Sequence, residues 1–169
     1  MKILFIAPSA YLLGGVQDWL MQLVPALRKK GLEVVIAVPD GRKHDYKAYV
    51  KCFPELNAIA FSNPTGSKWG RVRSLYKLVK KQSPDIVVGV NIGDLYTSIS
   101  ELRRRCNFGG HVVMTIHAIE EDYLSDLHAQ ISVIDSVIAT NRLTCELAHC
   151  KALMPKERIF YAPYGVPID

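Results

Sequence analysis

The chain has 169 residues, of which 49% are hydrophobic and 22% are charged. This length suits one domain with a single core, and the composition excludes a disordered or fibrous protein. The formal net charge of +5 permits an anionic partner such as a phosphate, a nucleotide or a membrane surface without requiring one, and the sequence contains no motif of a nucleic-acid reader.

The first forty residues predict a β-α-β unit. An apolar run that ends at Pro8 is typical of a strand buried on both faces of a parallel sheet. Apolar residues then recur at steps of three and four, as on one face of a helix, and Gly31 follows a cationic last turn. The predicted elements are a strand over residues 2–7, a helix over residues 16–30 and a strand over residues 32–38, which closes at the turn 39–41.

The same alternation continues along the rest of the chain, and Asp94 is predicted to cap one of the helices. Residues 40–57 give the least clear pattern. Further strands are predicted over residues 57–61, 85–90, 111–116, 136–139 and 158–162, and further helices over residues 67–82, 94–106, 120–131 and 142–153.

This order of elements predicts an α/β protein, a Rossmann-like doubly wound sandwich with a mainly parallel sheet of about seven strands. No hairpin signal, internal repeat or interdomain linker interrupts the alternation, so residues 1–169 are predicted to form one domain. In an open parallel sheet, ligands bind beyond the carboxyl ends of the strands. Functional residues are therefore expected in the segments that directly follow the predicted strands.

Gly14 and Gly15 lie directly before the first predicted helix. Two glycines let the backbone approach a ligand closely, and the start of a helix offers free N–H groups to an anion. A phosphate contact, a sugar contact and a simple flexible turn all remain open at this point. A dinucleotide site requires G-x-G-x-x-G directly after the first strand, and here the loop is longer and the third glycine is missing. Asp40 is more typical of a turn than of a ribose-binding acid.

His117 directly follows the predicted strand over residues 111–116. An imidazole at this edge can donate a hydrogen bond to a sugar hydroxyl or transfer a proton, although it can also simply end the strand. Three acidic residues come next: Glu120, Glu121 and Asp122. At least two of them are expected in a first helical turn, where carboxylates favour the helix dipole.

Two basic clusters lie on predicted helices and are compatible with either a solvated surface or attraction to anionic lipid headgroups. A small apolar tip in the first loop and Trp69 beside the first cluster would suit a lipid-linked acceptor. The clusters are Arg71, Arg73, Lys77, Lys80 and Lys81, followed by Arg103, Arg104 and Arg105, and the apolar tip is Tyr11, Leu12 and Leu13.

The four cysteines form no C-x-x-C pair, and no zinc-type spacing of Cys and His occurs, so no metal site is predicted and the thiols are expected to be free. The apolar run at the N-terminus is too short for a signal-peptide core, and no apolar stretch is long enough to span a bilayer. A cytoplasmic protein is expected, and a location at the inner face of the membrane is compatible with this expectation.

Three segments together resemble the retaining GT-B glycosyltransferases of family 4. The first is M-K-I-L-F-I-A-P…G-G-V-Q…A-L-R-K-K-G over residues 1–39, the second is Thr115-Ile116-His117, and the third is residues 158–169, similar to I-x-V-I-P-N-G-V-D. The order and spacing also match, so the resemblance covers the whole chain. It implies one half of a GT-B fold, namely the N-terminal domain that holds the acceptor.

The resemblance also implies a function in transferring a hexose-type sugar from a nucleotide-sugar donor to a glycan or lipid-linked acceptor, with retention of configuration and without a cofactor or an obligatory metal. A role in cell-envelope polysaccharide synthesis is expected with it. The donor-binding domain is expected to be absent, because no pair of glutamates stands eight positions apart, so the isolated domain should be inactive. The implied catalytic residue is His117, and the implied substrate-binding residues are Gly14, Gly15, Asn141, Tyr164 and Gly165.

This chain departs from the family pattern at several places. Gln17 stands where Glu is common, Asn141 where Ser is common, and Tyr164 where Asn precedes Gly165, while Ala118 follows the histidine in place of Asp. Two alternatives remain open: a nucleotide- or dinucleotide-binding oxidoreductase domain, and a non-catalytic sugar- or lipid-binding module with the same fold.

Overall fold

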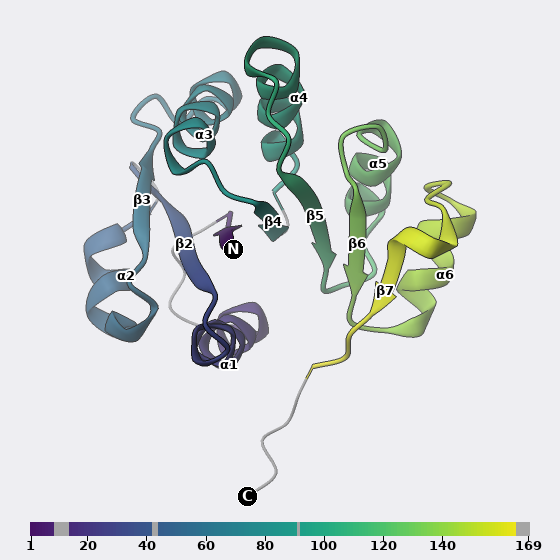
Figure 1. Cartoon of the computed structure of the whole chain (residues 1–169), viewed down its shortest axis with the longest axis horizontal. Helices are drawn as coiled ribbons and strands as arrows, with labels where there is room; N and C mark the ends of the chain where they lie inside the picture. The colour runs from purple at the N-terminus through teal and green to yellow at the C-terminus, as the bar shows by residue number, and fades with distance from the viewer. Residues whose placement is uncertain (9–13, 42–43, 91, 165–169) are drawn as a thin grey trace, which may run out of the picture.

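The structure is a computed structural model that describes residues 1–8, 14–41, 44–90 and 92–164. The described residues form one seven-stranded sheet, and every pair of neighbouring strands is parallel (Figure 1). The strand order is β3-β2-β1-β4-β5-β6-β7. The strands are β1 (Lys2–Ile6), β2 (Glu33–Asp40), β3 (Ile59–Ser62), β4 (Ile86–Val90), β5 (His111–Ile116), β6 (Ser136–Ala139) and β7 (Ile159–Tyr161).

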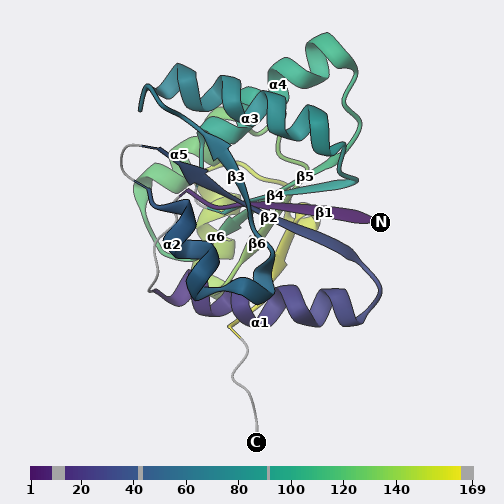
Figure 2. The same ribbon diagram turned by 90° about the vertical axis from the view of Figure 1, so that its left-hand side faces the viewer.

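Helices connect the strands and cover both faces of the sheet, which gives three layers (Figure 2). On one face α1 and α2 pack over a core that includes Leu20, Val24 and Tyr49, and on the other α3 to α6 pack over a core that includes Leu75 and Ile99. The helices are α1 (Gly15–Lys29), α2 (Tyr46–Cys52), α3 (Lys68–Gln82), α4 (Asp94–Cys106), α5 (Glu121–Ala129) and α6 (Arg142–Cys150), with short 3₁₀ turns η1 (Pro54–Leu56) and η2 (Lys156–Arg158).

The direction of winding changes between β1 and β4. From β1 the chain proceeds to β2 and β3 on one side, and it then returns to β4 and proceeds to β5, β6 and β7 on the other. The carboxyl ends of β1 and β4 are therefore followed by helices on opposite faces of the sheet, which leaves a crevice between them. This topological switch point is where open α/β sheets bind their ligands.

The predicted fold class is confirmed, and three details differ from the sequence-based expectations. α2 was not predicted, because only Tyr49 among its seven residues is buried, which leaves no apolar periodicity. β2 continues through Pro39 to Asp40 instead of ending at residue 38, and Pro39 pairs with Phe61 of the edge strand β3. A proline is tolerated there because the strand is about to end.

The third difference concerns Asp94, which does not cap α4. The helix begins at Asp94 itself, after Gly93, and no side chain caps its first turn. The Asp94 carboxylate instead accepts a hydrogen bond from Arg71 Nε and forms an ion pair with that guanidinium. The electrostatic attraction of a cation on α3 thus outweighs the local capping bond.

Candidate functional site

The expected rim of functional residues is present at the carboxyl ends of the parallel strands. Gly14 and Gly15 open α1 after β1, and His117 directly follows β5. The indole of Trp19, one turn into α1, meets the His117 imidazole edge to face, with ring centroids 4.7 Å apart. The prediction that the glycine pair and the imidazole share one rim is therefore confirmed.

The His117 ring lies in a chain of hydrogen bonds whose direction can be worked out. The buried Thr115 Oγ1 donates its proton to the carbonyl oxygen of Gly89 at 3.2 Å, so towards His117 it can only accept. His117 Nε2, 3.0 Å from Thr115 Oγ1, is thus the protonated nitrogen of the ring. His117 Nδ1 is left as the acceptor, and the Tyr164 hydroxyl donates to it at 2.8 Å.

The surroundings of His117 favour its neutral form. Burial lowers the pKa of the imidazole from 6.5 to about 4. Aromatic rings contribute to this burial, since Trp19 packs against His117 on one side and is itself in contact with Phe5 of β1 at 6.0 Å between centroids. At neutral pH His117 is therefore a fixed hydrogen-bonding group and not a cation.

The glycine pair shapes the start of α1. Gly14 has φ of 140° and ψ of 156°, a conformation that residues with a Cβ rarely adopt, and it is the N-cap of the helix. A Cβ at Gly14 or Gly15 would meet no atom within 4 Å among the described residues, so this side of the helix start is open. Gly14 and Gly15 are exposed, and they lie about one turn from Trp19 and its contact with His117.

The remaining predicted site residues have different positions. Tyr164 lies on the His117 ring, as its hydrogen bond and ring contact show. Asn141 is the N-cap of α6, and its side-chain oxygen accepts hydrogen bonds from both the N–H and the hydroxyl of Thr144. Asn141 thus stabilises the first turn of α6 at the rim. Gly165 lies outside the described residues, as do Tyr11, Leu12 and Leu13.

The arginines of the predicted basic clusters are largely paired with acids. Arg71 pairs with Asp94, Arg103 with Asp135, and both Arg104 and Arg105 with Glu101. The other cations of α3, at positions 68, 73, 77, 80 and 81, are exposed. Among the described residues of these clusters, the exposed cations without an acidic partner therefore lie on α3.

The described part of the chain contains neither a cluster of metal ligands nor a membrane-spanning helix. Within residues 1–8, 14–41, 44–90 and 92–164, no three His, Cys, Asp or Glu side chains come together as a metal ion would require. None of the helices in this part of the chain is long and apolar enough to cross a membrane. All four cysteines are free thiols, as expected.

Comparison with protein families gives one assignment. The model of Glycosyltransferase Family 4 matches residues 13–169, which is most of the chain. The chain belongs to Glycosyltransferase Family 4. No curated protein sequence matches it.

Solved structures share the fold of this family 4 domain at low sequence identity. They include Anabaena Alr3699/HepE in complex with UDP-glucose (16% identity, TM-score 0.69), which aligns with 98% of this chain and 44% of its own. A glycosyltransferase from Rickettsia africae ESF-5 (15%, TM-score 0.68) aligns over 98% and 43%. The UDP-GlcNAc 2-epimerase from Neisseria meningitidis bound to UDP-GlcNAc (10%, TM-score 0.65) aligns over 97% and 47%. The chain thus spans less than half the length of these proteins and corresponds to one half of a GT-B fold.

Some contacts of the candidate site were not predicted from the sequence. Trp19 lies in the helix predicted over residues 16–30 and received no role in the site, and Thr115 entered only as part of the motif Thr115-Ile116-His117, yet both contact His117. The position of Thr115 two residues before His117 is a usable signal, because residues two apart in a strand point to the same face. No local pattern predicts the contact of Trp19, since it depends on how α1 packs across the sheet.

Proposed function

We propose that this chain is the N-terminal, acceptor-side domain of a retaining nucleotide-sugar glycosyltransferase, and that a second, donor-binding domain completes the enzyme. The observation that supports this most is the neutral His117 ring beside the open start of α1 in a member of family 4. Without the second domain the nucleotide would have only one wall of its cleft, so the isolated chain is expected to be inactive.

In this proposal His117 binds the donor sugar near the reacting carbon. Its Nε2–H is held by Thr115, which fixes the ring, while Nδ1 is the acceptor that faces Tyr164. A sugar hydroxyl can donate to Nδ1 when it replaces the Tyr164 hydroxyl. Since the ring stays neutral, this lone pair is available throughout the physiological pH range.

The start of α1 would act on the departing nucleoside diphosphate. This leaving group gains negative charge as the bond between its phosphate oxygen and the anomeric carbon of the sugar breaks. Free N–H groups at a helix start stabilise such charge. Gly14 and Gly15 allow a phosphate to approach those groups because no side chain stands in the way. The UDP-sugars bound to the Anabaena and Neisseria proteins support a nucleotide sugar as the partner.

The acceptor is proposed to be a glycan or a lipid-linked molecule of cell-envelope polysaccharide synthesis, and the protein to act in the cytoplasm at the inner face of the membrane. The exposed cations of α3 and the neighbouring Trp69, whose surface is 72% exposed, support a peripheral membrane contact.

A transfer assay tests the proposed function. The chain is joined to the donor-binding domain that the proposal requires and is incubated with radiolabelled UDP-hexoses and a membrane extract as the source of acceptors. We expect transfer, with the anomeric configuration retained in the product. His117→Ala should lower turnover about 100-fold, because a preorganised polar contact at the reacting sugar is lost.

His111→Ala is the matched control, since His111 lies at the opposite end of β5 and bonds to Ser136 Oγ there. Its turnover should remain that of the unchanged protein. Equal turnover of His117→Ala and His111→Ala would remove His117 from the site. Binding of UDP-hexoses without any transfer would instead indicate a non-catalytic sugar-binding module.

A further inference from the structure

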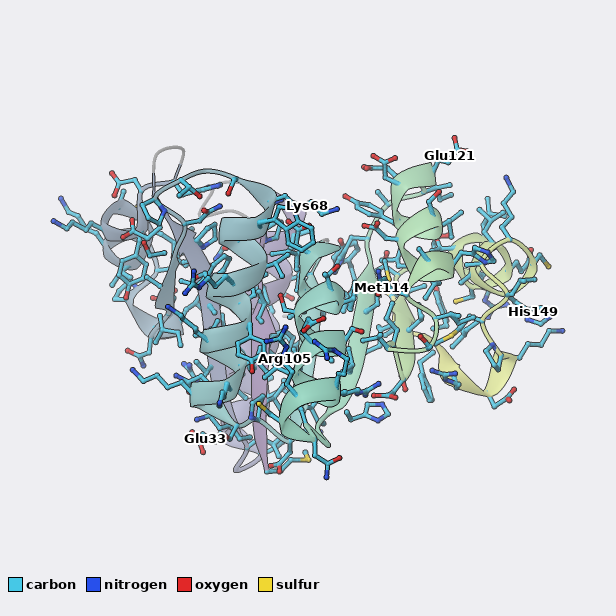
Figure 3. All side chains as sticks on the ribbon, turned by 90° about the horizontal axis from the view of Figure 1, so that it is seen from above. Glu33, Lys68, Arg105, Met114, Glu121 and His149 are labelled. Atoms are coloured by element: carbon cyan, nitrogen blue, oxygen red, sulfur yellow. The ribbon has the colours of Figure 1, made fainter. Side chains whose placement is uncertain are left out.

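A polar cavity of about 310 Å³ lies at the topological switch point, on the face of the sheet that α3, α4 and α5 cover. Pro8 and Ile92, which follow β1 and β4, form its floor at the sheet. Figure 3 shows Lys68 and Glu121 at the starts of α3 and α5, at the same end of the molecule. The charged side chains that line the cavity are Lys68 and Arg71 of α3, Asp94 of α4 and Asp126 of α5.

Two of the charged side chains of the cavity, Asp94 and Arg71, neutralise each other. Asp94 is buried, with only 9% of its surface exposed, and the Arg71 guanidinium holds its carboxylate through a hydrogen-bonded ion pair. A buried carboxylate needs such a partner, and the pair joins α3 to α4. Arg71 is thereby less available to an anionic ligand than an unpaired arginine would be.

The other two charged side chains, Asp126 and Lys68, are available to a ligand. Among the residues that the structure describes, no side chain or N–H group forms a hydrogen bond or ion pair with the Asp126 carboxylate or the Lys68 ammonium. Burial, together with the charges of Asp122 and Asp94, raises the pKa of Asp126, and Lys68 opposes this rise. A partly desolvated carboxylate of this kind gains from a hydroxyl group that donates to it.

The backbone makes room for Asp126. A Cβ on Gly93 would collide with Asp126 Oδ2, so the carboxylate lies directly over the start of α4 only because position 93 is glycine. Gly93 itself has φ of −61° and ψ of −33°, which any residue can adopt. The glycine is thus required for the position of the carboxylate and not for the turn.

The described residues that line the cavity include two positive and two negative groups, so their formal charges sum to zero. A phosphate would be attracted by Lys68 but repelled by Asp126, and an amine would meet the reverse. A sugar hydroxyl suits both, because it donates to a carboxylate and accepts from an ammonium. Gln130 and Thr97, which also line the cavity, add further neutral donors and acceptors.

We propose that this cavity binds the sugar or cyclic polyol ring of a neutral, hydroxyl-rich acceptor, with Asp126 and Lys68 bound to its hydroxyls. This inference rests on the proposed transferase function, in which the chain holds the acceptor. It adds that the ring of the acceptor that enters the cavity carries no charge. A lipid carrier attached to that ring would lie outside the cavity.

Titrations of the isotope-labelled chain test the inference without any donor. The neutral probes are glucose, galactose, mannose and myo-inositol, and the charged probes are glucosamine and glucose 6-phosphate, which keep the glucose ring. We expect at least one neutral probe to shift the amide signals of Lys68, Gly93 and Asp126, and to do so at lower concentration than either charged probe. The inference is wrong if glucose 6-phosphate or glucosamine binds best, or if no neutral probe shifts these signals.

Two variants locate the binding. Asp126→Ala removes the carboxylate and Gly93→Ala displaces it, and each should weaken binding about tenfold, as expected for a lost charge-assisted hydrogen bond. Glu121→Ala is the matched control, because Glu121 is an exposed carboxylate of the same helix that does not line the cavity and is not among the charges that raise the pKa of Asp126. Dispersed amide spectra check that all three variants are folded. Unchanged binding by Asp126→Ala would overturn the assignment.

The outcome is separable from that of the transfer assay. If the chain binds neutral sugars at these residues but supports no transfer, the cavity remains a sugar site and the proposed enzyme activity is contradicted. An enzyme that transfers sugar while the amides around Asp126 stay unshifted by every neutral probe would keep its activity and refute the cavity as the acceptor site.

Discussion

The proton positions around His117 follow from one buried hydroxyl. Because Thr115 donates to the Gly89 carbonyl, the order of donors and acceptors is set through the imidazole to Tyr164. Protonation of His117 Nδ1 would require the Tyr164 hydroxyl to turn and accept, and it would place a positive charge in a largely buried position. The loss of solvent around that charge opposes the charged form of the ring.

The pKa of His117 makes the stability of the fold depend on pH. The unfolded chain has an ordinary histidine pKa of 6.5, and burial lowers it to about 4 in the folded chain. As pH falls from 6.5 to 4, the unfolded chain binds a proton that the folded chain excludes, so the free energy of unfolding decreases; above pH 6.5 this contribution is fully present. We expect a loss of roughly 2 kcal/mol, allowing for the solvent that still reaches the ring.

Urea unfolding at two pH values, one near 7 and one near 4.5, measures this effect in the unchanged chain and in His117→Gln. The acidic groups contribute equally to both, so the difference between the two pH dependences reports on the imidazole. An identical pH dependence in both proteins would show that His117 is not buried in its neutral form.

Single residues were predicted from the sequence only where the strand pattern placed them. His117, Gly14 and Gly15 could be assigned to the rim because each follows or precedes a clear element. Asp94 was predicted wrongly, since its ion pair with Arg71 joins residues on two helices and no local rule contains it. Asp126 was not singled out at all, because its importance depends on the absence of a Cβ on Gly93.

Among the elements, α6 shows how a predicted binding residue can serve the helix instead. Asn141 is extended, with φ of −141° and ψ of 156°, and its side chain satisfies the N–H of Thr144 in the first turn. This is the usual bonding of an N-cap, and the serine that the resemblance leads one to expect at this place would bond in the same way. Among the described residues, the side-chain NH2 group of Asn141 has no hydrogen-bond partner, so a role in substrate binding would fall to that donor.

Substitution at Asn141 separates the two roles. Asn141→Ala should lower the free energy of unfolding by about 1 kcal/mol, because a first-turn N–H of α6 loses its partner. Asn141→Ser should keep the stability of the unchanged chain, since a hydroxyl also caps. Urea denaturation measures both. A capping role alone predicts that Asn141→Ser keeps full turnover in the transfer assay, and a loss of turnover at unchanged stability would establish a substrate contact.

The elements themselves were largely predictable because buried parallel strands read as continuous apolar runs. The seven strands and five of the helices match the expected positions to within a few residues. The unpredicted α2 is held by Asp45, which caps it through Ala48 N–H, and by one buried tyrosine. With so little apolar surface, its helical state depends on packing against β2 and η1, which a local pattern does not contain.

At the scale of the whole molecule, charge is distributed unevenly among the helices. α3 contains six Lys and Arg residues and no acid, and it lies on the face that also holds the proposed acceptor cavity. Trp69 stands exposed at the end of α3 that opens onto the rim. A membrane contact through this helix would bring a lipid-linked acceptor towards the cavity.

Vesicle sedimentation tests the membrane contact. Replacing Lys77, Lys80 and Lys81 by serine should reduce binding to vesicles that contain phosphatidylserine by about 100-fold, because each cation near an anionic surface contributes about 1 kcal/mol. Replacing Lys29, Lys30 and Lys51 by serine removes the same charge from the α1 and α2 side and should have a much smaller effect. Equal losses would indicate nonspecific attraction, and no binding by the unchanged chain would contradict the contact.

The order of the strands has a consequence for the synthesis of the protein. β1 leaves the ribosome before β4, but β4 is one of its two neighbours, and the register pairs Ile3 with Ile86. One of the two hydrogen-bonding edges of β1 must therefore wait until β4 has been translated. A nascent chain stalled before that point exposes an unpaired apolar strand, which makes it a natural client for chaperones.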